Sequence, residues 1–138
     1  MEFKTDLITY NGVYRTIMTE KLNLPTSEGR RTILANHMPI MMPLQVGVIE
    51  TQEDGSLKHY AVNGGVMYFR DNVAEIVADS LVDVEEIDIE EAEKEKAKEE
   101  EKLSKARREN ERIRAQNRID VAENLIKAKQ KYLENRNK

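Results

Sequence analysis

The side chains best suited to recognising a charged partner are cationic and lie in the last third of the chain. They are Arg107, Arg108, Arg112, Arg114, Arg118, Lys127, Lys129, Lys131 and Arg136. Tyr132 is the only ring in this stretch on which a base could stack, and acidic residues interrupt the run, so we do not expect a nucleic-acid site. An acidic protein surface fits these charges better.

Residues that could catalyse a reaction do not converge anywhere along the sequence. Cysteine is absent, and His37 and His59 belong to no metal-binding spacing such as H-E-x-x-H. The many carboxylates lack the apolar surroundings that separate two pKa values for acid–base catalysis. Gly64 and Gly65 are not followed by Lys-Ser or Lys-Thr, so they predict a bulge or a bend between strands rather than a phosphate loop. We expect no catalytic residue, no metal and no cofactor.

A second candidate surface is the apolar segment from His37 to Leu44. Its two prolines exclude a regular helix and a central strand. Burial in a core is the simpler interpretation of the segment. A partner surface is the alternative, because methionine adapts to irregular apolar contacts.

The elements that must position these residues change type along the chain. Short apolar runs rich in β-branched residues alternate with Gly, Asn and Asp turns as far as about Val82, a pattern that predicts a small β-sandwich. The expected strands are Phe3–Thr9, Val13–Met18, Ile33–Leu34, Val46–Thr51, His59–Val62, Val66–Phe69 and Val73–Ala78.

From Asp83 onward the sequence is typical of helices, since it contains no Gly or Pro and is dominated by Ala, Glu, Lys and Arg. Asp88 is expected to cap a first helix, whose apolar side runs through Ala92, Lys96, Ala97 and Leu103. A second apolar stripe follows at Ala115, Ile119, Ala122, Ile126 and Leu133. Asn110 is a possible break between the two, but one continuous helix remains an alternative to a helical hairpin.

Composition indicates two modules with different partners. Aromatic residues make up 5% of the 138 residues and charged residues 35%, which is little core material for a fully globular chain. Residues 1–90 carry 7 basic and 15 acidic side chains, whereas residues 91–138 carry 15 basic and 11 acidic ones. No apolar stretch approaches the ~20 residues of a membrane span, so we expect a cytosolic chain without direct membrane insertion.

Taken together, these patterns resemble the epsilon subunit of bacterial F-type ATP synthases. The stretch from Gly29 to Leu44 keeps, without a gap, the register of the family's G-E-L-G-I-L-P-G-H-x-P-L-x-x-P-L loop. Ala61 to Phe69 is similar to its A-V-S-G-G-F-L-E-V strand pair. Ile87 to Ala92 is similar to its I-D-x-x-R-A helix start, and Val121 to Lys127 to its R-A-E-N-R-L-K segment.

The resemblance implies an α+β chain with an N-terminal antiparallel β-sandwich at residues 1–84 and a C-terminal two-helix hairpin at residues 85–138. The sandwich would bind the gamma subunit and the c-subunit ring, and would couple rotation to proton or sodium-ion flow. The helices would lie folded against the sandwich or extend along gamma into the hexamer of alpha and beta subunits, and in the extended form they would obstruct ATP hydrolysis. The chain would then be a non-catalytic rotor subunit, held peripherally at the cytoplasmic face of the cell membrane.

The same resemblance assigns contact residues to each module. For the c ring and gamma they are Arg30, Arg31, His37, Met38, Met41 and Met42. For an acidic loop of the beta subunit they are Arg114, Arg118, Lys127, Lys129 and Lys131.

One departure from the family pattern concerns the sandwich loop. The family has Glu after the glycine, on the side that faces the c ring, where this chain has Arg30 followed by Arg31. Like charges across an interface can cost several kcal/mol. We therefore expect the facing loop of the partner c subunit to be more acidic than usual.

A second departure concerns nucleotide binding. Several family members bind ATP through the Asp and Arg of the first motif and the arginines of the second, which supply charge-assisted donors. This chain keeps Asp88 and Ala92 but has Glu91, Val121 and Leu125 where those arginines stand. We expect that it does not bind ATP in the family's way.

A free-standing adaptor, with a ligand-binding sandwich and a coiled coil that pairs two chains, is the alternative function. The heptad pattern is too broken to sustain several turns of a coiled-coil seam, which disfavours it.

Overall fold

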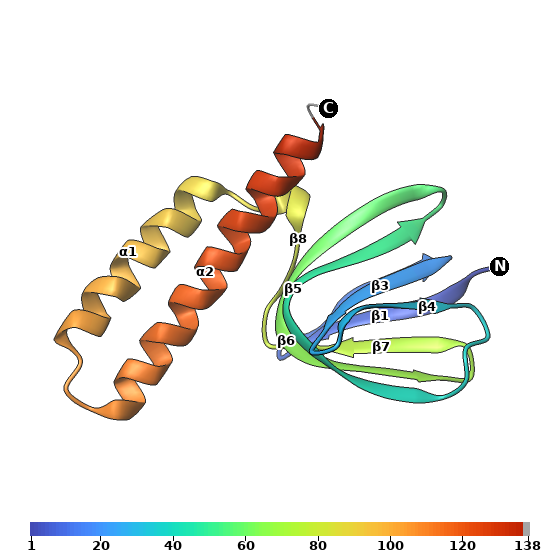
Figure 1. The fold of residues 1–138 in the computed structure, drawn as a ribbon, viewed down its shortest axis with the longest axis horizontal. Helices are drawn as coiled ribbons and strands as arrows, with labels where there is room; N and C mark the ends of the chain where they lie inside the picture. The colour runs from blue at the N-terminus through green and yellow to red at the C-terminus, as the bar shows by residue number, and fades with distance from the viewer. Residues whose placement is uncertain (137–138) are drawn as a thin grey trace. The chain divides into compact units, whose positions relative to one another are not determined.

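The computed structural model describes residues 1–136, so residues 137 and 138 of the predicted helical module lie outside the described part. The chain divides into two compact units, Met1–Asp83 and Val84–Lys138. The first unit is built from strands and the second from helices (Figure 1).

The first unit is a mixed, strongly curved sheet. In chain order its strands are β1 Phe3–Thr9, β2 Gly12–Thr19, β3 Lys21–Thr26, β4 Gly29–Leu34, β5 Ile40–Glu53, β6 Ser56–Arg70, β7 Val73–Val77 and β8 Leu81–Asp83. The spatial order is β2-β1-β7-β6-β5-β3-β4, and β8 pairs with β6. The predicted β-sandwich is confirmed, although β1 and β7 form one parallel pair among otherwise antiparallel neighbours.

The two long strands hold the halves of this sandwich together. The 15-residue β6 pairs with β8 at Tyr60–Val62 and with β7 at Val66–Arg70. Gly64 and Gly65 lie between these two pairings with φ of +78° and +140°. A side chain at Gly65 would collide with the carbonyl oxygen of Val77. The predicted bend is present, but inside one strand rather than between two.

The core follows the two-residue period of strands. In β1 the side chains of Phe3, Thr5 and Leu7 are buried and Lys4 is exposed. Phe3 packs edge-on against Phe69 of β6, with ring centroids 5.4 Å apart. Burial of such side chains is the main stabilising term for this unit. Other fully buried members of the core are Leu22, Leu24, Ile33, Ile49, Tyr60, Met67 and Ile76.

The strands differ from the sequence prediction in several places: β5 begins at Ile40 rather than at Val46, and the predicted strands His59–Val62 and Val66–Phe69 are parts of the single strand β6. Strands β3 and β8 were not predicted, and β4 begins at Gly29 rather than at Ile33. Pro25 obscures the alternation of β3, yet it is accommodated because it lies against Gly47, where an added Cβ would come within 3.0 Å of the proline ring. The segment around Pro43 was not predicted as a strand, but residues 40–44 form the first part of β5. Pro43 is tolerated there because this half of β5 pairs only with β6.

The second unit is the predicted helical hairpin, not one continuous helix. A 3-10 turn, η1 (Val84–Glu86), precedes α1 (Ile89–Lys105) and α2 (Glu109–Arg136). Asp88 caps α1 as predicted, because its carboxylate accepts from the amides of Glu90 at 3.0 Å and Glu91 at 3.4 Å. The predicted break at Asn110 is wrong. The chain leaves the helix at Ala106, which adopts an extended ψ of 131°, and Asn110 lies in the first turn of α2.

The seam between the helices is made largely of small side chains. Ala92 of α1 and Ala115, Ile119 and Ala122 of α2 are buried. Leu133 is 40% exposed, so the predicted stripe does not continue to that end of α2. Ala97 is exposed, contrary to prediction, and Glu99 is buried on α1 instead.

Candidate interaction surfaces

The methionine segment divides between core and surface according to strand alternation. Met42 is 7% exposed and belongs to the core, whereas Met41 is 61% and Met38 is 72% exposed. His37 is half-buried. Its Nδ1 donates to the carbonyl oxygen of Met38 at 2.7 Å, and its ring lies edge-on to Phe69. Of the predicted contact residues here, Met38 and Met41 are thus the ones most accessible to a partner.

Arg30 and Arg31 lie exposed on β4, a terminal strand of the sheet. The Nε of Arg30 donates to the side-chain oxygen of Asn23, and a terminal nitrogen donates to the Asn23 carbonyl oxygen at 3.2 Å. A guanidinium nitrogen of Arg31 lies 3.6 Å from the Glu28 carboxylate. Both cations are therefore held near β4, and Arg30 is fixed against the neighbouring β3.

A row of exposed and half-buried apolar side chains crosses the outer face of the sheet. It runs through Pro43, Val66, Val77, Ile8 and Val13, each of which is the cross-strand partner of the next. Val77 is 40% and Val13 is 62% exposed. We call these five residues the outer apolar row. Because neighbouring strands are ~4.8 Å apart, the row spans roughly 19 Å.

The surroundings of the outer apolar row add to its area. Met41 and Tyr68 are cross-strand partners two positions along β5 and β6, on the same face as Pro43 and Val66, and Tyr68 is 45% exposed. Contiguous apolar surface of this kind marks protein interfaces more often than free solvent-facing surface. The row is not apparent in the sequence because each strand contributes one outward apolar residue, and only the register aligns them.

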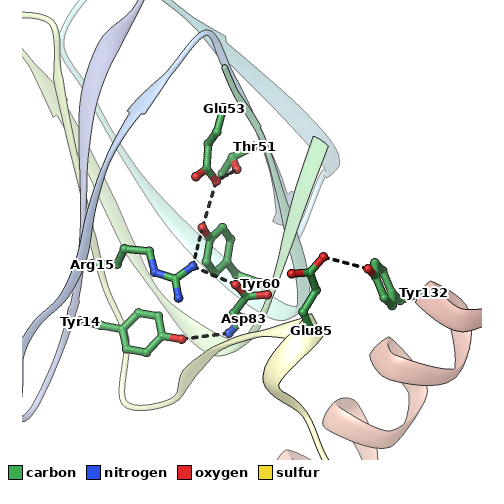
Figure 2. A network of polar contacts seen from close by, with 8 residues as sticks. All are labelled: Tyr14, Arg15, Thr51, Glu53, Tyr60, Asp83, Glu85 and Tyr132. Carbon is green, nitrogen blue, oxygen red and sulfur yellow. Dashed lines mark hydrogen bonds and ion pairs between the residues drawn. The ribbon is translucent and has the colours of Figure 1, made fainter. Parts of the chain in front are cut away.

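A polar network fixes the last residue of the first unit (Figure 2). An Arg15 guanidinium nitrogen donates to the Asp83 carboxylate at 2.8 Å and to the Tyr60 hydroxyl at 3.2 Å. The Tyr60 hydroxyl donates to Glu53 at 2.9 Å, and Thr51 also donates to Glu53. The backbone amide of Asp83 donates to Tyr14 at 3.3 Å. Strand β2 therefore anchors Asp83 by its side chain and by its backbone.

The electrostatics of this network favour anchoring over proton transfer. The hydrogen bond to Asp83 raises the pKa of Arg15 above its already high ordinary value, so the guanidinium stays charged. Burial raises the pKa of Tyr60 above its ordinary value, so the phenol stays protonated at neutral pH. A fixed cation and a neutral phenol position Asp83 and do not resemble a general acid–base pair.

Two of the predicted cationic contacts, Arg114 and Arg118, meet at the loop end of the hairpin. They line a shallow cavity of about 360 Å³ together with Lys102, Lys105, Ala106, Ala115, Glu99 and Glu111. An Arg118 nitrogen lies 3.3 Å and the Lys102 ammonium 3.6 Å from the Glu99 carboxylate.

Glu99 is the buried charge of the hairpin seam, with 1% of its surface exposed. Burial alone would raise the pKa of its carboxyl, but the hydrogen bond from Arg118 and the charge of Lys102 outweigh that effect. The pKa of Glu99 therefore lies below its ordinary value, and the side chain is ionised at neutral pH.

The other predicted cations lie in the C-terminal half of α2. Lys127 and Lys131 are exposed, while Lys129 is half-buried and donates to the carbonyl oxygens of Val84 and Glu85. Arg118 is thus engaged by Glu99 in the hairpin seam, and Lys129 is engaged by η1.

Residues 2–84 match the family described as "ATP synthase, Delta/Epsilon chain, beta-sandwich domain". The ATP synthase epsilon chain of Lactobacillus helveticus is 32% identical over 124 residues, which cover 87% of this chain and 84% of that one. The chain belongs to the ATP synthase epsilon family. The resemblance inferred from the sequence is confirmed.

Further relatives of this epsilon-family chain are also bacterial. The epsilon chain of Lactobacillus gasseri is 32% identical over 138 residues, covering 90% of this chain and 94% of that one. The epsilon chain of Lactobacillus delbrueckii subsp. bulgaricus is 36% identical over 90 residues, and the match covers 62% of each chain.

Solved structures show the same fold. A chain in the cryo-EM structure of the Euglena gracilis mitochondrial ATP synthase (OSCP/F1/c-ring, rotational state 1) superimposes with a TM-score of 0.71 at 24% identity. The superposition covers 92% of this chain and 81% of that chain.

The residues at the family's nucleotide motif have other roles in this epsilon-family chain. The Asp88 carboxylate is occupied as the cap of α1, and Ala92 is buried in the seam. Glu91 is exposed, and Val121 and Leu125 are half-buried. None of these five side chains is a cation that could bind a triphosphate. That the chain does not bind ATP in the family's mode stays a prediction.

Among residues 1–136 no three His, Cys, Asp or Glu side chains are grouped as they would be around a metal ion. Neither described helix is long and apolar enough to span a bilayer.

Proposed function

We propose that this chain is a non-catalytic subunit of the ATP synthase central stalk, in which the sandwich joins the gamma subunit to the c ring. Family membership supports the proposal. The folds it resembles come from assemblies described as OSCP/F1/c-ring and as central stalk/c-ring. In that role the chain couples rotation to proton or sodium-ion flow and lies peripherally at the cytoplasmic face of the cell membrane.

The outer apolar row is the observation that carries the assembly role. It presents aliphatic side chains across five strands, of which Pro43, Val77 and Val13 are exposed, with Met41 and Tyr68 beside them. A partner that covers these side chains removes apolar surface from water, at about 25 cal/mol per Å². We assign this row to the gamma contact, and Met38 with Arg30 and Arg31 to the contact with the c ring.

Charge substitution in the row tests the assignment. Val77→Glu and Val13→Glu each place a carboxylate in the proposed interface. Leu57→Glu is the matched control, because Leu57 is 61% exposed, Val13 is 62% exposed, and Leu57 lies outside the row. The measurement is co-purification of the full-length chain with gamma and the c ring.

We expect both valine variants to lose co-purification by at least tenfold while Leu57→Glu is retained. Equal recovery of all three variants would exclude the row as an assembly surface. Circular dichroism of each isolated variant separates a lost contact from a lost fold.

The helical unit is assigned the regulatory part of the proposal. In an extended state its basic residues would approach an acidic loop of the beta subunit, next to alpha, and obstruct ATP hydrolysis. Arg114, Lys127 and Lys131 support this assignment because they are exposed cations on α2. Exposed cations attract an acidic surface over several ångströms and are sensitive to salt.

The charge reversal at Arg30 leads to a separate proposal about the c subunit. An acidic loop opposite Arg30 and Arg31 would restore complementarity across that contact. Reading the loop of the partner c subunit tests this, since a basic loop there would contradict it.

The adaptor alternative is less well supported. The apolar stripe that a homomeric coiled coil would need is used inside the chain, where Ala115, Ile119 and Ala122 are buried in the hairpin.

A further inference from the structure

The helices of the hairpin differ in length, which leaves one end of α2 without a helical neighbour. α1 has 17 residues and α2 has 28. Because the two helices run antiparallel from a short loop, roughly the last ten residues of α2 extend past the start of α1. The alanine seam cannot hold this overhanging end.

The overhanging end of α2 packs instead on the 3-10 turn that precedes α1. Ala128 of α2 is 6% exposed, and Val84 and Ile87 are 1% and 7% exposed. Ala128 has little apolar surface to bury, because alanine contributes a single methyl group. Apolar packing alone would leave this end weakly held.

Polar contacts concentrate at the same place. The Lys129 ammonium donates to the carbonyl oxygen of Val84 at 3.2 Å and to that of Glu85 at 3.1 Å. The Tyr132 hydroxyl donates to the Glu85 carboxylate at 2.9 Å (Figure 2). The ammonium also lies 5.5 Å from the centre of the Tyr132 ring, which orients both side chains. Lys129 and Tyr132 are three residues apart and share a helix face.

We propose that Lys129 and Tyr132 form a latch that closes the end of α2 onto η1, and that this latch opens independently of the α1–α2 seam. Hydrogen bonds from a cation, or to an anion, are stronger than neutral ones, so three such contacts decide whether a weakly packed helix end stays docked. The latch does not depend on the proposed function. One consequence does rest on the proposed function: a partner that binds the Lys129 ammonium must first open the latch.

Amide hydrogen exchange of the full-length chain tests the latch. The Lys129→Gln/Tyr132→Phe double variant removes the cation and the hydroxyl while keeping helix-forming or isosteric side chains. Lys131→Gln is the matched control, because Lys131 is an exposed lysine of the same helix. We expect exchange at residues 126–134 to rise roughly tenfold in the double variant, while residues 113–122 and the control stay unchanged.

Two results would overturn the proposal. Exchange at residues 126–134 no faster than in Lys131→Gln would mean that these contacts do not hold the helix end. An equal rise at residues 113–122 would mean that the hairpin opens as one unit.

A mutant cycle adds a second criterion. Tyr132→Phe should have no further effect on exchange in a Glu85→Ala background, since the acceptor is already gone. Additive effects of the two changes would contradict a direct Tyr132–Glu85 contact.

Discussion

The sandwich and the hairpin are stabilised by different kinds of interaction. In the sandwich, large apolar side chains such as Leu22, Ile49 and Phe69 are at most 1% exposed. In the hairpin, the seam consists mainly of alanines, and a buried carboxylate at Glu99 is held by cations. Burial of large side chains contributes more free energy than exposed or partly exposed ion pairs.

This difference suits the sandwich to a permanent contact and the hairpin to rearrangement. A helix pair with few buried apolar contacts opens at low free-energy cost, while a well-packed sheet opens only on global unfolding. The following changes should therefore act on one unit and spare the other.

The largest effect is expected from a cavity in the sandwich core. Leu22→Ala should lower the free energy of unfolding of the sandwich by about 3 kcal/mol, because the side chain is fully buried. Chemical denaturation followed by near-UV circular dichroism of the tyrosines measures it. Ile119→Ala in the hairpin should leave the same transition in place, and an equal loss from both variants would remove the distinction between the units.

Alkaline pH should weaken the sandwich through Tyr60. Its pKa in the folded chain is raised above the ordinary 10.0, so the stability it contributes is fully present below pH 10 and is lost as the pH rises toward the folded value. The free energy of unfolding should fall by about 1.4 kcal/mol for each pH unit between 10 and the folded pKa. Tyr60→Phe should remove this part of the pH dependence, and an unchanged slope in the variant would contradict the assignment.

Acidic pH should weaken the hairpin through Glu99, with the opposite sign. The pKa of Glu99 is lowered from 4.5, so the stability it contributes is present above that value and is lost as the pH falls through the folded pKa. Glu99→Gln should lower the free energy needed to open the hairpin by about 1 kcal/mol at neutral pH. Amide exchange of α1 and α2 should then rise roughly fivefold.

Glu100→Gln is the control for this variant, because Glu100 is an exposed neighbour on the same helix. Equal exchange in the two variants at neutral pH would show that the Glu99 ion pairs do not hold the seam.

Sequence patterns predicted the elements that depend on residues close to one another in the chain. The cap at Asp88 and the strand at Phe3–Thr9 were correct because neighbouring residues determine them. Strand β3 was missed because Pro25 disguises it, and its place depends on the distant Gly47.

The features missed by sequence analysis depend on pairing between distant segments. The outer apolar row requires the register of five strands, and the burial of Glu99 requires the position of Arg118 on the other helix. The contacts of Lys129 with η1 likewise join residues 44 and 45 positions apart in the sequence. No periodicity within a single element encodes these arrangements.

The separation of assembly from regulation is tested most directly in the whole ATP synthase. The measurement compares complex assembly and the rate of ATP hydrolysis with the full-length chain and with a chain that lacks residues 85–138. We predict that the complex still assembles, because the outer apolar row is intact, and that hydrolysis is faster, because the helices no longer obstruct it. An assembled complex with unchanged hydrolysis, or a failure to assemble, would contradict this division of roles.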